Sequence, residues 1–194
     1  MEILEQLYNY ARENYIPIID DESLEVLLAE VTQTKPKRIL EIGTAVGYSG
    51  ALMLQKSDAV LDTIEIDENR RNIAQKLWKE LGIDSRINSY LGSADEILGE
   101  VIADKEYDFV FIDGPKSRCS QYYDECFEHI SSGGVIFVDD VLFFGMVKGQ
   151  DWVSHKHRTI VNNLRKFLDK IQSDARVDVT ILDIGNGIAV IRKK

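Results

Sequence analysis

The sequence predicts an α/β fold in which a mostly parallel sheet carries helices on both faces. Apolar runs of strand length alternate with amphipathic segments of helix length, which is typical of such folds. The last two expected strands are separated by Gly185-Asn186-Gly187, a pattern that favours a tight hairpin. A strand that returns through so short a turn is antiparallel to its partner, so we expect a seven-stranded sheet with an antiparallel last strand.

Each element is placed by its own pattern of residues. Short apolar runs bounded by glycine or polar residues predict strands at 38–43, 59–67, 86–92, 107–113, 133–140, 176–183 and 188–194. Helical spacing of apolar residues predicts helices from about residue 47, then at 68–81, 93–102, 121–130 and 157–171. The run at 107–113 is apolar at nearly every position, as a central parallel strand requires.

The chain length and composition favour one domain, residues 1–194, since 194 residues with 44% apolar content can bury one sizeable core. We expect a helical segment at 1–36, broken at Pro17, ahead of an α/β core at 37–194. No apolar run approaches the roughly 20 residues that span a bilayer, and the first residues lack the order of a secretion signal, so we expect a cytoplasmic protein with no membrane partner. The net charge of −10 argues against nucleic-acid binding over the whole surface.

Acidic residues gather at the carboxyl ends of the expected strands, where open α/β sheets bind their ligands. The strand ends carry Glu41, Glu65, Asp113, Asp139 and Asp140. The sequence therefore predicts a ligand crevice rimmed by carboxylates.

The turn after the first strand, GTAVGYS, predicts close approach of the backbone to a ligand. Gly43 and Gly47 remove side chains at two points, and the following helix offers unpaired N–H groups to an anion. This spacing is not the G-x-G-x-x-G of dinucleotide enzymes, and a ligand with a small carboxylate and a nucleoside fits it better. Glu65 would then accept hydrogen bonds from both ribose hydroxyls.

These motifs resemble the class I S-adenosylmethionine-dependent methyltransferases, which have a Rossmann-like fold. The resemblance rests on E-I-G-T-x-x-G-Y-S after the first strand, Glu65 after the second, G-S-A after the third and the terminal hairpin. It implies S-adenosylmethionine as cofactor, bound by Glu41, Gly43, Gly47, Tyr48, Ser49, Glu65, Ser93, Ala94 and Asp113. A Rossmann-like domain for another nucleotide is the alternative.

Two further stretches, FIDGPK at 111–116 and VDDVLFFG at 138–145, resemble the metal-dependent O-methyltransferases of the catechol and caffeoyl-coenzyme A type. The resemblance implies that Asp113, Asp139 and Asp140 bind Mg²⁺ or a similar cation. Neighbouring strands lie about 4.8 Å apart, so carboxylates at their ends repel unless a cation neutralises them. Asp140 stands where the family usually has Asn. The added negative charge should raise cation affinity or favour Mn²⁺ or Ca²⁺, or else Asp140 is partly protonated. Alternatively, Asp139 and Asp140 merely cap the following loop.

Lys116 matches the family lysine that orients or deprotonates the attacking hydroxyl, so the resemblance implies Lys116 and Asp113 as catalytic residues. A lysine near a divalent cation should have a depressed pKa, which suits a base. The alternative is an ordinary surface lysine on a loop.

The acceptor must offer two adjacent oxygens to the expected cation, and both a catechol and 5-hydroxyuracil do so. The stretches NYIPIIDDESLEVLL, ILEIGTAVGYSG and VLFFGMV resemble the bacterial tRNA 5-hydroxyuridine methyltransferases, which make 5-methoxyuridine at the wobble position. The resemblance implies a tRNA anticodon loop as partner and a homodimer. A small catechol-like or phenolic substrate is the second hypothesis, and a methyl-donor-binding protein without catalysis is the third.

If RNA is the substrate, aromatic residues after the fifth strand would stack on bases and basic residues would contact phosphates. The aromatic candidates are Phe143, Phe144 and Trp152, and the basic ones are Lys148, Lys156, Arg158 and Arg165. Aromatic residues in such a loop more often pack as a lid or at a dimer contact.

Overall fold

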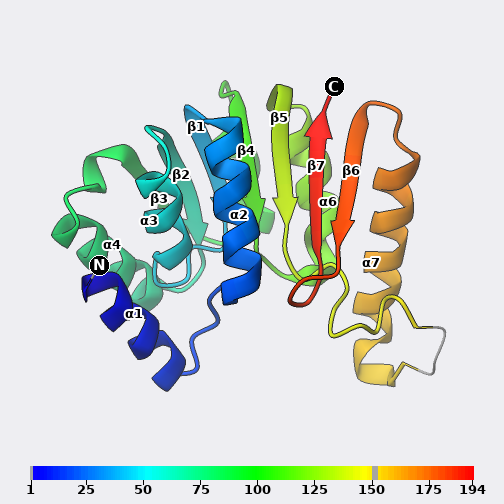
Figure 1. Cartoon of the computed structure of the whole chain (residues 1–194), viewed down its shortest axis with the longest axis horizontal. Coiled ribbons are helices and arrows are strands. Elements are labelled where there is room, and N and C mark those ends of the chain that lie inside the picture. The colour runs from blue at the N-terminus through cyan, green and yellow to red at the C-terminus, as the bar shows by residue number, and fades with distance from the viewer. Residues whose placement is uncertain (1, 150–152) are drawn as a thin grey trace.

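The computed structural model describes residues 2–149 and 153–194 and contains the expected seven-stranded sheet. Its strands are β1 (Arg38–Ile42), β2 (Val60–Glu65), β3 (Ile87–Leu91), β4 (Tyr107–Ile112), β5 (Ile130–Val138), β6 (Val177–Leu182) and β7 (Ile188–Lys193). The spatial order is β3-β2-β1-β4-β5-β7-β6. Strand β7 pairs antiparallel with both β5 and β6, while the pairs among β1 to β5 are parallel. Its arrow in Figure 1 therefore points opposite to the other six. The fold prediction is confirmed.

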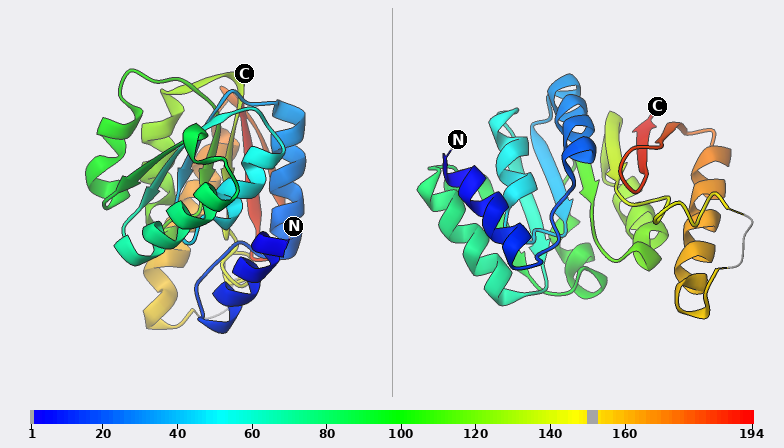
Figure 2. Two further views of the ribbon diagram at one scale, coloured as in Figure 1. Left: turned by 90° about the vertical axis from the view of Figure 1, so that its left-hand side faces the viewer. Right: turned by 60° about the horizontal axis from the view of Figure 1, so that its bottom comes forward.

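Seven α-helices and two short 3₁₀ helices, η1 and η2, occupy the described residues. Their bounds are α1 (Glu2–Glu13), α2 (Asp21–Thr34), α3 (Tyr48–Gln55), α4 (Glu68–Glu80), η1 (Asp84–Arg86), α5 (Ala94–Ile102), η2 (Lys116–Arg118), α6 (Cys119–Phe127) and α7 (His155–Ser173). One buried cluster joins α5, α6 and α7 to one face of the sheet, and two others join α1 to α4 to the opposite face. Figures 1 and 2 show this three-layer arrangement, with α2 and α6 on opposite sides of the strands.

The chain order reverses between β1 and β4, which are neighbours at the centre of the sheet. Strands on either side of this point lead their connections to opposite faces, so the two turns that follow β1 and β4 diverge and leave a crevice. Residues Ile42 and Ile112 are paired at the ends of these strands. The predicted ligand residues follow directly after them.

Several boundaries differ from the sequence-based prediction by one to three residues; helix α6, for example, ends at Phe127 and not at residue 130. Strand β5 begins at Ile130, three residues before the expected start, because Ile130 pairs with Tyr107 and a register shift between Tyr107 and Phe109 accommodates the extra residues. Helix α7 begins at His155 rather than near residue 157. In the part of the chain that the structure describes, no helix has both the length and the apolar composition to cross a bilayer.

Candidate functional site

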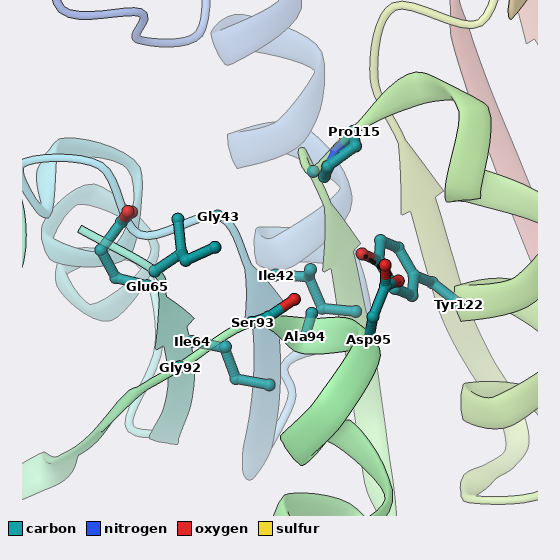
Figure 3. Close-up of a pocket in the computed structure, with 12 residues that line it drawn as sticks. Ile42, Gly43, Ile64, Glu65, Gly92, Ser93, Ala94, Asp95, Pro115 and Tyr122 are labelled. Atoms are coloured by element: carbon teal, nitrogen blue, oxygen red, sulfur yellow. Dashed lines mark hydrogen bonds between the residues drawn. The ribbon is translucent and has the colours of Figure 1, made fainter.

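A cavity lies at the switch point between β1 and β4. Figure 3 shows Glu65 toward one end of it and Tyr122 with Asp95 toward the other. The residues that line it come from the ends of β1, β2, β3 and β4 and from α5 and α6: Ile42, Gly43, Ile64, Glu65, Ile66, Gly92, Ser93, Ala94, Asp95, Gly114, Pro115 and Tyr122. Four of the nine residues expected to bind the cofactor are therefore in its wall: Gly43, Glu65, Ser93 and Ala94.

The glycine turn is packed against its surroundings so closely that neither glycine tolerates a side chain. Gly43 has φ +104°, and a Cβ there would lie 2.5 Å from the carbonyl oxygen of Asp113. Gly47 has φ +81°, and its Cβ would lie 2.8 Å from both Ala74 and Trp78. Glycine alone enters this φ range without strain, so the two residues shape the loop that borders the cavity.

The carboxylate of Glu65 holds the same loop in place. Its Oε2 accepts a hydrogen bond from Ala45 N at 2.7 Å, and its Oε1 accepts one from Asp67 N at 2.9 Å. Each carboxylate oxygen has two lone pairs, so both can still accept a ligand hydroxyl. The geometry therefore fits the predicted ribose contact, and Glu65 also orders the turn itself.

Glu41, Ser49 and Tyr48 do not line the cavity. Glu41 is fully buried and accepts hydrogen bonds from Ser49 Oγ and Thr63 Oγ1, both at 2.6 Å. The ring of Tyr48 packs instead against Tyr8 of α1, with centroids 5.7 Å apart. Burial raises the pKa of Glu41 to about 7, although the two hydroxyl donors act in the opposite direction. Glu41 thus ties β1 to β2 and α3 beneath the loop.

Asp95 and Tyr122, which were not predicted from the sequence, close the far end of the cavity. Tyr122 donates a hydrogen bond to Asp95 Oδ1 at 2.9 Å, and Arg118 pairs with Asp95 Oδ2 at 3.2 Å. Asp95 directly follows the predicted Ser93-Ala94, and that position was the one available hint. Ile66 was also missed, although it is 70% exposed beside Glu65, an unusual placement for a large apolar side chain.

The acidic residues at the ends of β4 and β5 converge as predicted, but a lysine lies among them. Lys116 Nζ is 2.7 Å from Asp113 Oδ1 and 3.0 Å from Asp140 Oδ2. Asp139 is only 3% exposed, and its Oδ1 accepts a hydrogen bond from Asp140 N at 2.8 Å. Asp140 has φ +61°, a left-handed conformation that turns its side chain toward Lys116.

In this arrangement, with carboxylates and no divalent cation beside it, the pKa of Lys116 shifts upward. Burial alone would lower the pKa, but the carboxylates of Asp113 and Asp140 raise it above its usual range. Lys116 is therefore protonated in this arrangement, and its role as a base beside a divalent cation stays a prediction. Asp139 has a pKa raised to about 7, because it is buried and lies near Asp113 and Asp140.

The predicted divalent cation stays a prediction. Carboxylate oxygens are the ligands that Mg²⁺ and Ca²⁺ prefer, so the donor chemistry of Asp113, Asp139 and Asp140 suits them. Among residues 2–149 and 153–194, however, no group of three or more acidic, histidine or cysteine side chains is arranged to hold a metal ion. The three carboxylates do not fit a cation as they stand, because Lys116 holds two of them.

The segment after β5 has an unusual backbone. Phe143 and Phe144 have φ values of +43° and +55°, a region that costs free energy for residues other than glycine. Their rings form an edge-to-face pair at 5.3 Å, and Phe143 also contacts the His157 ring at 5.5 Å. Phe144 is 69% exposed. Trp152, the third predicted stacking residue, lies outside the described residues.

Two of the four predicted phosphate contacts are engaged within the protein. Arg165 Nε donates to the Val147 carbonyl at 3.0 Å, and its Nη2 donates to the Met146 carbonyl at 3.1 Å. Lys148 pairs with Asp183. Lys156 and Arg158 are exposed in the first turn of α7.

Comparison with known proteins gives one family match, to a model described as O-methyltransferase, over residues 1–194. A caffeoyl-CoA O-methyltransferase of Stellaria longipes is 30% identical over 168 residues, which is 82% of this chain and 69% of the relative. The catechol O-methyltransferase domain-containing protein 1 of Mus musculus is 32% identical over 174 residues, covering 86% of this chain and 64% of the relative.

Solved structures have the same fold. A methyltransferase of Podospora anserina, bound to SAH, superposes with a TM-score of 0.86 at 25% identity and covers 100% of this chain and 88% of its own. The O-methyltransferase TomG of Streptomyces achromogenes, in complex with SAM, gives a TM-score of 0.87 at 23% identity, with 100% and 90% covered. At that identity the second match supports the fold alone.

Proposed function

The chain belongs to the O-methyltransferase family and is an S-adenosylmethionine-dependent enzyme, and we propose that its acceptor is a hydroxyl on a planar ring with a second oxygen on the adjacent ring atom. The observation that carries this proposal is the ammonium of Lys116 between Asp113 and Asp140, directly after β4 and β5. An ammonium has three N–H donors. Two of them serve Asp113 and Asp140, which leaves the third for an oxygen of the acceptor.

S-adenosylmethionine, when bound, would supply a methyl group whose carbon bonds to the acceptor oxygen while the C–S bond breaks and its electron pair stays on the sulfur. The glycine turn and Glu65 would orient this donor beside the ends of β1 and β2. Lys116 would stabilise negative charge on the attacking oxygen, because a fixed ammonium lowers the free energy of an adjacent oxyanion. Asp139, with a pKa of about 7, would take the hydroxyl proton near neutral pH and pass it to water.

A small phenolic compound is the first candidate acceptor. The relatives named above carry caffeoyl-CoA and catechol in their names, and both names point to ortho-dioxygenated rings. The net charge of −10 disfavours a polyanion, and two of the four predicted phosphate contacts, Arg165 and Lys148, are engaged within the protein. These observations support the small substrate.

A tRNA with 5-hydroxyuridine at the wobble position is the second candidate. Exposed Lys156 and Arg158 lie in the same turn of α7 as His157, whose ring contacts Phe143, and Phe144 projects nearby. A cationic turn beside an exposed ring suits a splayed nucleotide and its phosphates. We further propose a homodimer for this case, since two such turns would double the contacts to one tRNA.

Transfer of a labelled methyl group to 5-hydroxyuridine-containing tRNA and to simple catechols separates the candidates. A tRNA acceptor predicts labelled 5-methoxyuridine, a rate that falls steeply with salt, and a loss in the Lys156→Ala, Arg158→Ala double variant. A small acceptor predicts labelled catechol ether and no effect of that variant. The Glu2→Ala variant, at an exposed position of α1, serves as a control for both. If neither substrate class is labelled, the proposed acceptor chemistry is wrong. A parallel assay in chelator tests the predicted cation.

A further inference from the structure

A divalent cation bound to both Asp113 and Asp140 would share the two carboxylates that Lys116 already contacts. Its Nζ is 2.7 Å from Asp113 Oδ1 and 3.0 Å from Asp140 Oδ2. Protein oxygens bind Mg²⁺ at about 2.0–2.1 Å and Ca²⁺ at about 2.3–2.6 Å. An ion bound to these two oxygens would lie closer to each of them than the ammonium does, and would repel the ammonium at short range.

The charges of the cluster also disfavour an ammonium and a divalent cation side by side. The cluster has three carboxylates, of Asp113, Asp139 and Asp140, and one ammonium, so the ammonium neutralises part of the repulsion between the strand ends. A divalent cation would neutralise more of it, but would also repel the ammonium at contact distance. The side chain of Lys116 is 15% exposed, so part of it borders solvent at the edge of the site.

We infer that Lys116 is an internal counter-cation that competes with divalent cations for Asp113 and Asp140, so that an ion enters this site only by displacing the lysine side chain. The three carboxylates fail to form a metal-binding group as they stand because two of them are turned toward Lys116. Ion binding and the position of the Lys116 ammonium are thereby linked: whatever fills the site also determines where the lysine points.

Mn²⁺ binding, followed by electron paramagnetic resonance on the whole chain without methyl donor or acceptor, tests the competition. Lys116→Met removes the competing charge and keeps an apolar stem, so we expect it to bind Mn²⁺ at least about ten-fold more tightly than the wild type, and Lys116→Gln to do likewise. Adding Asp140→Ala to Lys116→Met should reverse the gain. Lys170→Met is the matched control, because Lys170 also pairs with an aspartate, Asp124, but on the outer surface of α6 and α7.

A measurement on the wild type keeps the test independent of these variants. In protein with isotope-labelled lysine, Mg²⁺ should shift the side-chain resonances of Lys116 and leave those of Lys170 unchanged. Equal or weaker Mn²⁺ binding by both Lys116 variants, or Mg²⁺ binding without a shift at Lys116, would overturn the inference, as would no ion binding by any variant. Because neither assay involves methyl transfer, these outcomes are independent of the proposed acceptor.

Discussion

The indole Nε1 of Trp78 donates a hydrogen bond to the carbonyl oxygen of Gly47 at 3.2 Å, and so joins α4 to the glycine turn beside the cavity. Trp78 is 1% exposed and also packs against the position where a Gly47 side chain would stand. A residue thirteen positions beyond Glu65 thus supports from behind the loop that we propose to bind the cofactor.

Trp78→Phe should weaken binding of S-adenosylmethionine. The substitution keeps most of the apolar contact but leaves the Gly47 carbonyl without its side-chain donor, at a cost of about 1 kcal/mol or more. We expect the KM for S-adenosylmethionine to rise by about five-fold or more and kcat to change little, because Trp78 does not reach the reacting atoms. A fall in kcat at unchanged KM would contradict this role.

Glu65→Gln should weaken cofactor binding more strongly than Trp78→Phe does. A neutral amide loses one acceptor oxygen, so it cannot hold Ala45 N, Asp67 N and two ribose hydroxyls together. Titration calorimetry should show at least a ten-fold loss of affinity for S-adenosylhomocysteine. Glu68→Gln, at the exposed start of α4, is the matched control and should bind as the wild type does.

Stability should depend on pH through Glu41. Its folded-state pKa, about 7, exceeds the 4.5 expected of the unfolded chain, so the folded state holds this proton more tightly. The stabilisation is present below about pH 4.5 and is lost as pH rises through 7, by roughly 3 kcal/mol. Glu41→Gln removes this titration, so its stability relative to the wild type should rise between pH 5 and 7.5 in urea unfolding. A constant difference across that range would show that Glu41 is not the source.

Two glycine substitutions should act in opposite directions. A Cβ at Gly187 would collide with the Leu142 side chain, and the residue has φ +92°, so Gly187→Ala should destabilise the fold by about 2 kcal/mol or more. Gly99 lies within α5 with open space around it, so Gly99→Ala should stabilise by about 0.5–1 kcal/mol. Denaturant unfolding of both variants against the wild type measures each change.

The strands and helices could be predicted because apolar periodicity and local turn residues determine them. The seven strands follow the apolar runs, and the Gly185-Asn186-Gly187 turn correctly indicated the antiparallel strand. The start of β5 was wrong because pairing with β4 extended it, and pairing is a contact between distant residues.

The candidate site was predicted in part. Gly43, Glu65, Ser93 and Ala94 follow strand ends, a position that sequence can locate, and all four line the cavity. Glu41 and Ser49 belong to the same motif but point into the core, since alternate residues of a strand face opposite ways and helix packing selects which face is buried. Asp95 and Tyr122 meet only because α5 and α6 pack together.

The sequence by itself determined the order of the elements and the presence of acidic residues at the ends of β4 and β5, because both depend on neighbours in the chain. Only the tertiary structure decided what those carboxylates hold. Lys116 reaches Asp113 across one short turn, but it meets Asp140 because β4 and β5 are paired and Asp140 takes a left-handed conformation. That contact joins residues 24 positions apart, and its geometry follows from sheet pairing that no local pattern encodes.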